Sequence, residues 1–265
     1  MQAVVDFLVD ERCHACGRFV EAAARLPLPA AAASSSLASP LRTARIESRP
    51  LCRACCHELV AANAPAIIGT ACADGSIELV SGGRIPGLAP HAGAPKDVLA
   101  VWPAFETDDR ILAVIHALKF SRRERLAPWL ARALAQGLPA RALEPDARVM
   151  RLVPVPMDDS AQRRRGFNQA ERLASALGAL TGVAIERGAI AKTRATAPQS
   201  SLGRDERVQN VTGAMSVVDG DALAGRRVVL VDDLVTTGAT AAACAVAAWS
   251  AEAADVRVVC AGFRP

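Results

Sequence analysis

Apolar residues in the C-terminal two thirds of the chain gather in short runs, separated by longer stretches with helical spacing. Residues 228–231, VVLV, form the clearest run, and four such residues in succession predict a buried strand of a parallel sheet. The alanine-rich stretch that follows, up to residue 254, is typical of a helix. Further strands are predicted at residues 97–105, 149–156, 185–191, 217–218 and 255–262. Alternating strands and helices indicate an α/β fold with a parallel-sheet core.

Helical spacing is clearest on both sides of residue 122. Apolar residues recur from 111 to 118, and Thr107 is a plausible N-cap for this helix. A second helix is predicted over residues 124–136, beginning or bending at Pro128. Asn168 can cap a third helix, over residues 169–180. Basic residues crowd the joint between the first two helices: Lys119, Arg122, Arg123 and Arg125. This run fits either a solvated face or a phosphate contact.

Composition narrows the class of protein only in part. The chain has 265 residues, of which 51% are hydrophobic and 3% aromatic, and tyrosine is absent. A net charge of +4 is too small to indicate a nucleic-acid-binding protein without a patterned distribution. There is no apolar run of about 18 residues and no basic leader before the short apolar segment at the N-terminus. We therefore expect a cytoplasmic protein with no membrane insertion.

Cysteines cluster near the N-terminus in two Cys-x-x-Cys pairs. The first pair is Cys13 and Cys16, followed by a glycine that permits a tight turn, and the second is Cys52 and Cys55. In a reducing compartment, paired thiolates favour metal over disulfides, and four of them can close a tetrahedral structural zinc site. A set of reduced, buried cysteines is the alternative.

The chain is predicted to divide into two parts. Residues 1–98 form a Cys-rich zinc module, with an Ala/Ser/Pro-rich flexible insertion between the two cysteine pairs. A metal site tolerates such an insertion because the cost of closing a loop grows slowly with its length. Residues 73–98 are rich in glycine and proline and are expected to be an irregular connection. Residues 99–265 form the α/β domain, with Cys244 and Cys260 as expected core residues.

Candidate chemistry concentrates at the end of the strand predicted at residues 228–231. Asp232 and Asp233 stand where this strand should end, and a small polar loop opens the next helix: Thr236, Thr237, Gly238, Ala239 and Thr240. A helix N-terminus offers unpaired N–H groups to a phosphate. Carboxylates suit sugar hydroxyls, or magnesium that bridges a sugar and a pyrophosphate. The alternatives are a turn without a ligand and the magnesium-binding pair of a receiver-type domain.

Two arginine-rich stretches accompany this motif. The first, QRRRGFNQA at residues 162–170, is predicted to begin as a loop after the strand at 149–156, at the sheet edge where open α/β folds bind ligands. Arginine side chains grip pyrophosphate or nucleic-acid phosphates. The second stretch begins at residue 192, has few apolar anchors and is expected to be a mobile lid. Together the two contribute Arg163, Arg164, Arg165, Lys192, Arg194, Arg204 and Arg207.

Two resemblances to known families rest on these strings. VVLVDDLVTTGAT resembles the phosphoribosyl-pyrophosphate signature of the type I phosphoribosyltransferases. Nearly the whole chain resembles the ComF (competence protein F) family, through the N-terminal cysteine module and four longer strings: VWPAFETDDRILAVIHALKF, RRRGFNQAERLASAL, TRATAPQSSLGRDERVQNVTGA and VVLVDDLVTTGAT. The second resemblance implies a protein of natural transformation, in which a zinc module is joined to a type I phosphoribosyltransferase-like parallel-sheet core.

The resemblances also imply roles for single residues. Asp232 and Asp233 would bind ribose hydroxyls and magnesium, and the loop from Thr236 to Thr240 would bind the 5′-phosphate. Arg164, Arg165 and Gly166 would lie near the pyrophosphate, and Arg194 and Arg204 in the mobile loop.

The cysteine module departs from the pattern of the family. Where a further Cys-x-x-Cys is often found, only Cys72 is present, so that either Cys56 or Cys72 could replace one of the four zinc ligands.

Three functions fit these residues. The first, which we rank highest, is a DNA-uptake factor. It would bind phosphoribosyl pyrophosphate or a similar sugar phosphate, single-stranded DNA and proteins of the competence machinery. The second is a working phosphoribosyltransferase on an unknown acceptor, with Asp232 and Asp233 steadying a cation-like ribose. The third is a sensor of phosphoribosyl pyrophosphate without turnover. Aromatic residues for base stacking are few, and Phe167 and Phe263 are the nearest candidates.

Overall fold

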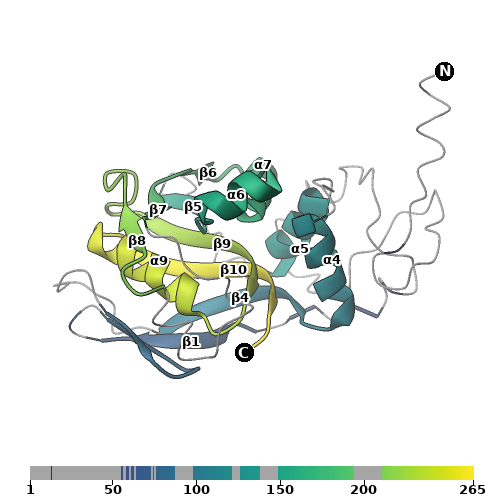
Figure 1. The fold of residues 1–265 in the computed structure, drawn as a ribbon, viewed down its shortest axis with the longest axis horizontal. Coiled ribbons are helices and arrows are strands. Elements are labelled where there is room, and N and C mark those ends of the chain that lie inside the picture. The colour runs from purple at the N-terminus through teal and green to yellow at the C-terminus, as the bar shows by residue number, and fades with distance from the viewer. Residues whose placement is uncertain are drawn as a thin grey trace, which may run out of the picture.

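The chain folds around one mixed sheet, and its strand order brings two motifs to the same edge. The computed structural model describes residues 13, 55, 58, 59, 61, 62, 64–72, 74, 76–86, 98–120, 126–137, 149–193 and 211–265. Within them, eight strands form the sheet (Figure 1). In spatial order they are β3 (Arg84–Ile85), β2 (Ile77–Leu79), β1 (Ala66–Ala71), β4 (Val98–Glu106), β10 (Asp255–Phe263), β9 (Arg227–Val235), β5 (Met150–Pro154) and β6 (Ala184–Ile185).

The larger part of the sheet is parallel. β4, β10, β9, β5 and β6 pair in parallel, whereas β1, β2 and β3 add an antiparallel extension beside β4. Two further strands, β7 (Ile190–Lys192) and β8 (Met215–Val217), form a separate antiparallel ribbon. The predicted α/β class with a largely parallel central sheet is confirmed.

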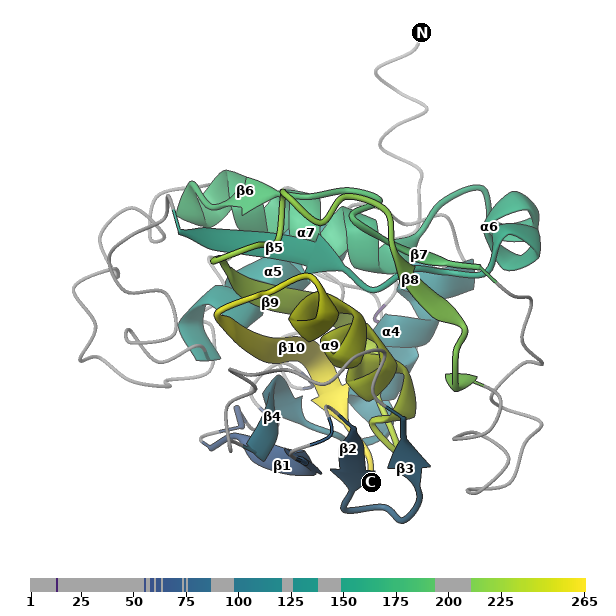
Figure 2. The ribbon, with the colours of Figure 1, turned by 90° about the vertical axis from the view of Figure 1, so that its left-hand side faces the viewer.

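Helices cover both faces of the sheet. On one face lie α4 (Asp109–Phe120), α5 (Leu126–Gly137) and α7 (Gln169–Thr181), and on the other lies α9 (Ala239–Ser250), which stands in front of β9 and β10 in Figure 2. Alternate residues of β9 divide between the two layers: Val229 and Val231 pack with the first, and Val228 and Leu230 with the second. This period of two explains why the run of four apolar residues is buried on both sides.

α9 is buried on nearly every side because it is covered twice. Its outer surface packs against the β7–β8 ribbon and against β2 and β3. Residues 241–249 are all buried, and most of them are alanine, whose small side chain lets the helix approach both layers closely.

Several predicted boundaries differ from the structure for local reasons. Asp108 rather than Thr107 caps α4, since its Oδ1 accepts hydrogen bonds from the backbone N–H groups of Arg110 (3.0 Å) and Ile111 (2.9 Å). The Thr107 hydroxyl instead donates to the carbonyl of Phe263 at 2.8 Å. Pro128 lies in the first turn of α5, where the missing N–H has no helical partner to lose.

Two stretches hold more strand structure than the sequence predicted. Part of the expected irregular connection at 73–98 forms the hairpin of β2 and β3, which extends the main sheet through β1. The single strand predicted at 185–191 is instead two short strands, β6 and β7, that belong to different sheets. Among the helices of the described residues, none has both the length and the apolar character that a membrane span requires.

Candidate functional site

The candidate site lies where the paths of β5 and β9 diverge. These strands are neighbours in the sheet, but the chain leaves β5 through α6 (Asp159–Arg165) and α7 toward β6, and leaves β9 through α9 toward β10 on the other side. α7 and α9 lie on opposite faces. Such a switch point opens a crevice at the carboxyl ends of the strands. The acidic motif and the first arginine stretch meet at this edge, as the sequence predicted.

The two carboxylates lie within the end of β9 and not beyond it, because the strand continues to Val235. Asp233 is 2% exposed, while Asp232 keeps part of its surface exposed. Asp232 Oδ1 accepts a hydrogen bond from the backbone N–H of Asp233 at 2.8 Å. Burial and the neighbouring charge of Asp233 raise the pKa of Asp232 well above its usual range, and Lys119 offsets part of this rise. The ionised form of Asp232 is therefore disfavoured, and a cation bound next to it would stabilise that form.

Lys119, at the end of α4, already supplies one positive charge. Its Nζ lies 2.8 Å from Oδ2 of Asp233, and its side chain is 23% exposed. On the other oxygen, Gln169 Nε2 donates to Asp233 Oδ1 across 3.5 Å. Arg165 donates in turn to Gln169 Oε1. Residues of α4, α6, α7 and β9 are thus joined in one polar network around Asp233.

Lys119 and Gln169 were not predicted as site residues. The sequence identified Lys119 only as part of a basic joint and Gln169 only as the start of a helix. Lys119 reaches the site because α4 crosses the carboxyl end of β10: a Cβ on Gly262 would lie 2.8 Å from Thr107 Oγ1 and 3.6 Å from Ile115 Cδ1. Figure 1 shows α4 standing across the strand ends. No local sequence signal specifies that direction.

The small polar loop is held in place by the neighbouring strands. Gly238 has φ +80°, and a Cβ there would lie 2.9 Å from the Cβ of Ile68 on β1. Ser81, between β2 and β3, donates to the carbonyl of Thr237 at 2.8 Å, and the Thr237 hydroxyl accepts from the N–H of Ala239 at 3.4 Å. Thr237 is buried, whereas Thr236 and Thr240 are partly exposed. The predicted loop and the start of α9 therefore form one fixed turn.

The first arginine stretch is a short helix and not the predicted loop. Asp158 caps α6 by accepting hydrogen bonds from the N–H groups of Ser160 (2.9 Å) and Ala161 (3.3 Å), and Gly166 ends it with φ +87°. Arg164 and Arg165 belong to the helix, and Gly166 is its C-cap. This correction leaves the arginines at the same sheet edge but fixes their spacing.

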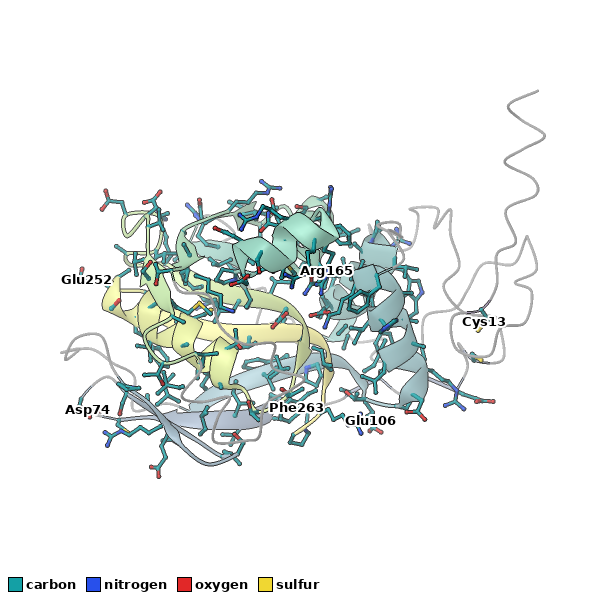
Figure 3. The ribbon with its side chains drawn as sticks, viewed as in Figure 1. Cys13, Asp74, Glu106, Arg165, Glu252 and Phe263 are labelled. Atoms are coloured by element: carbon teal, nitrogen blue, oxygen red, sulfur yellow. The ribbon has the colours of Figure 1, made fainter. Side chains whose placement is uncertain are left out.

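The arginines of α6 differ in their surroundings. Arg163 and Arg164 are exposed, and Arg164 Nη1 lies 3.2 Å from Ser160 Oγ. Arg165 is partly buried where α6 approaches α4 (Figure 3), and its guanidinium lies 5.0 Å from the centre of the Phe120 ring. Burial lowers the pKa of Arg165, and the charge of Asp233 opposes this effect.

Other predicted residues are only partly covered by the structure. Cys13 and Cys55, one from each cysteine pair, are both buried and belong to the same core cluster. Cys72 lies outside that cluster, and its thiol is 3.8 Å from the carbonyl of Thr70. Several predicted residues fall outside the described part of the chain: Cys16, Cys52, Cys56, Arg194, Arg204 and Arg207.

Of the two aromatic residues predicted for base stacking, Phe167 is buried and Phe263 is partly buried. Phe167 is 7% exposed and lies between α6 and α7. Phe263 packs against the core on the α9 side, and Figure 3 shows it away from Arg165.

Comparison with known proteins supports the resemblance to the ComF family that the sequence motifs indicated. No family model matches the chain. The chain is 38% identical over 148 residues to the DNA utilization protein YhgH of Escherichia coli (strain K12), a match that covers 56% of this chain and 64% of that protein. It is 36% identical over 90 residues to Competence protein F of Haemophilus influenzae, which covers 34% of this chain and 39% of that protein. Over about half of its length, the chain is therefore homologous to these YhgH and competence proteins.

The YhgH of Salmonella typhi gives the same result, at 37% identity over 156 residues and 64% of that protein. The matches to these YhgH proteins thus span less than two thirds of the length of the relatives. At the carboxyl edge of its sheet, the chain combines two adjacent carboxylates, a glycine turn at a helix start and a short arginine helix. Such a site can hold an anionic ligand whose sugar or metal meets the carboxylates.

Proposed function

We propose that the chain is a ComF-like factor of DNA uptake and utilisation. In this proposal the crevice between β5 and β9 binds phosphoribosyl pyrophosphate, or a related sugar phosphate, with magnesium, and the adjacent basic surface binds single-stranded DNA. The observation that carries the proposal is the unit formed by Asp232, Asp233 and the turn at Gly238. The names of the YhgH and competence relatives support the assignment to DNA metabolism.

Each part of the proposed ligand has a suitable counterpart. The N–H groups at the start of α9 suit the 5′-phosphate, and Gly238 lets the turn before this helix pack against Ile68. Asp232 and Asp233 would hold magnesium or the ribose hydroxyls, and Arg164 and Arg165 would face the pyrophosphate. Magnesium would supply positive charge to the pyrophosphate oxygens. We infer on these grounds a type I phosphoribosyltransferase-like core.

The ammonium group of Lys119 would compete with a magnesium ion for the carboxylate of Asp233. Its ammonium group lies 2.8 Å from Asp233 Oδ2, and a magnesium ion bound by that oxygen would have to displace it. The released ammonium group of Lys119 would then be free to supply its positive charge to the anionic ligand. The pair therefore couples metal binding to the placement of a cation beside the ligand.

A structural zinc ion is the second ligand we propose, held by Cys13, Cys16, Cys52 and Cys55. The shared burial of Cys13 and Cys55 supports this set. Metal analysis of the purified protein should find about one zinc per chain. A Cys13→Ser/Cys52→Ser variant that keeps its full zinc content would contradict the assignment.

Titration calorimetry with phosphoribosyl pyrophosphate, with and without magnesium, tests the main proposal. We expect magnesium-dependent binding in the parent protein, and at least a tenfold loss in Asp232→Asn/Asp233→Asn, because the carboxylates would provide the metal and sugar contacts. Circular dichroism should show that the variant stays folded. Unchanged affinity in a folded variant would exclude these carboxylates as ligands. Release of pyrophosphate with added nucleobases, followed in parallel, would identify a working transferase.

A further inference from the structure

Phe120, the last residue of α4, exposes its ring beside the candidate site. Its side chain is 62% exposed. Within the described residues, the other exposed large hydrophobic side chains are aliphatic: Ile67, Val80, Val149 and Val218. A single exposed apolar residue is ordinary on a protein surface, so its neighbours decide whether it has a role.

Two groups that favour aromatic ligands frame this ring. The guanidinium of Arg165 lies 5.0 Å from the ring centre, and the imidazole of His116 lies 4.6 Å from it with an angle of 40° between the planes. Both partners leave the ring largely in contact with solvent. Arginine and aromatic planes are the side chains on which nucleic-acid bases stack.

The ring is also linked directly to the crevice. Lys119, the preceding residue, turns inward to Asp233, while Phe120 turns outward. Arg165 contacts Phe120 and donates to Gln169, which contacts Asp233 in turn. Phe120 is therefore at the rim of the site that holds the acidic pair, and it is the described aromatic side chain that meets both conditions of exposure and proximity.

We propose that Phe120, with Arg165 and His116, is a stacking platform for a nucleobase. This inference rests on the proposed function, since it assigns the base-contacting part of the same DNA- and phosphate-binding surface. The base would stack on the exposed side of the ring, while its phosphates meet the arginines of α6. Stacking is tolerant of sequence because every base has a π-face. The shared chemistry is a nucleobase, whether it belongs to a single strand of DNA or to a free nucleotide.

Fluorescence anisotropy with two labelled strands tests the platform. One strand is oligothymidylate, and the other is an abasic strand of the same length with the same phosphates. The parent should bind the strand with bases more tightly. Phe120→Leu should lower its affinity for oligothymidylate by roughly 5- to 150-fold and leave its affinity for the abasic strand unchanged. Phe120→Trp, which keeps a π-face, should retain the preference for bases.

Control measurements separate this inference from the proposed function. Val218→Ala removes another exposed apolar side chain and should change neither affinity. Phe120→Leu should bind phosphoribosyl pyrophosphate as the parent does. Competition by thymidine monophosphate that is weakened equally by Phe120→Leu would assign the platform to free nucleotides as well.

Two results would overturn the platform. One is a parent that binds both strands equally, and the other is a Phe120→Leu variant that keeps the full preference for bases. Either result leaves binding of phosphoribosyl pyrophosphate in place, so that the proposed sugar-phosphate site stands. A parent that binds no phosphoribosyl pyrophosphate contradicts that site instead, whatever the two strands show.

Discussion

The two walls of the crevice occupy equivalent positions but are built in opposite ways. On the β9 wall, Asp233 is buried and Gly238 packs against Ile68. This wall therefore has only a small number of polar groups, and packing fixes their positions. On the β5 wall, α6 has no buried residue, and Arg163 and Arg164 are exposed. A small anionic ligand needs donors at defined positions, whereas a flexible polyanion needs mainly charge. Under the proposed function, the β9 wall would hold the small ligand and the β5 wall would contribute mainly positive charge.

The walls are connected through Asp233. Lys119 contacts it from α4. Gln169 donates a hydrogen bond to Asp233 and accepts one from Arg165 on the β5 wall. Asn168 strengthens the same junction, because its Oδ1 caps α7 at Ala170 (2.9 Å) and its Nδ2 donates to the carbonyl of Val155 (3.1 Å) after β5. A substitution at Asp233 should therefore alter contacts on both walls, while a substitution at Arg163 or Arg164 should alter contacts on the β5 wall alone.

Lys119→Met is expected to have the largest effect on stability. Methionine keeps the apolar stem of the side chain but leaves the buried Asp233 carboxylate without its countercharge. We expect a loss of about 2–3 kcal/mol at neutral pH, below the value for a fully buried pair because Lys119 is partly exposed. This corresponds to a fall in Tm of roughly 5–10 °C. Thermal unfolding followed by circular dichroism measures it.

A double-mutant cycle identifies the cause. Asp233→Asn added to Lys119→Met should recover most of the lost stability, since no buried charge remains unpaired. Magnesium should also stabilise Lys119→Met more than the parent, because the ion no longer competes with the ammonium group. Equal losses in the single and double variants would show that Lys119 stabilises α4 by packing alone.

Gly238→Ala should have the next largest effect. The position combines a left-handed φ of +80° with a Cβ contact of 2.9 Å to the side chain of Ile68. We expect a cost of about 2 kcal/mol, together with weaker binding of phosphoribosyl pyrophosphate. Gly225→Ala is the matched control, because φ is +65° but no atom lies within 4 Å of the added Cβ. It should cost only about 1 kcal/mol and leave binding unchanged. Equal effects of the two substitutions would remove the contact with β1 from the explanation.

The β9 wall was largely predictable because its parts are adjacent in sequence. The strand, the two carboxylates and the turn at Gly238 follow one another directly, and the structure keeps them in that order. The contacts that hold the turn were not predictable. Ile68 lies on β1, in the part assigned to the cysteine module, and Ser81 lies between β2 and β3, in the stretch expected to be irregular. Packing between segments far apart in sequence leaves no local pattern.

The β5 wall was predicted in position but not in structure. Asp158 and Gly166 are local start and stop signals for a helix, and the run of arginines between them was interpreted as a loop. Lys119 and Phe120 were missed as site residues for a different reason. Their role depends on the path of α4 across the sheet edge, and that path is set by the packing of Thr107 and Ile115 against Gly262.

Asp232→Asn should raise stability in the absence of ligand while it weakens binding. The pKa of Asp232 is raised in the folded state, so the native protein holds this proton more tightly than the unfolded chain does. The stabilisation is present below the unfolded pKa, about 4, and is lost as pH rises through the folded pKa. At pH 8 the variant, which carries no charge there, should therefore be more stable than the parent.

Urea unfolding at several pH values tests this sign. The advantage of Asp232→Asn should shrink as the pH falls toward 4, and magnesium should stabilise the parent more at high pH than at low pH. Asp221→Asn changes an exposed carboxylate and serves as the control, with little effect at any pH. A variant less stable than the parent at pH 8 would mean that Asp232 is stabilised by its contacts more than it is penalised by burial.

Arg163→Ala/Arg164→Ala should have the smallest effect on stability. It should also have the clearest effect on the salt dependence of DNA binding. Both side chains are exposed on α6, so we expect a change in stability below about 0.5 kcal/mol. Each contact with a DNA phosphate adds about 0.7 to the slope of log affinity against log salt for a single strand, so that loss of two contacts should reduce the slope by about 1.4.

Arg226→Ala/Arg227→Ala removes the same charge at the start of β9, at the opposite edge of the sheet, and should leave the slope nearly unchanged. If both double variants reduce the slope equally, net charge and not the β5 wall attracts DNA. If Arg163→Ala/Arg164→Ala weakens only phosphoribosyl pyrophosphate, the α6 arginines grip pyrophosphate, and the comparison between the two walls fails at this point.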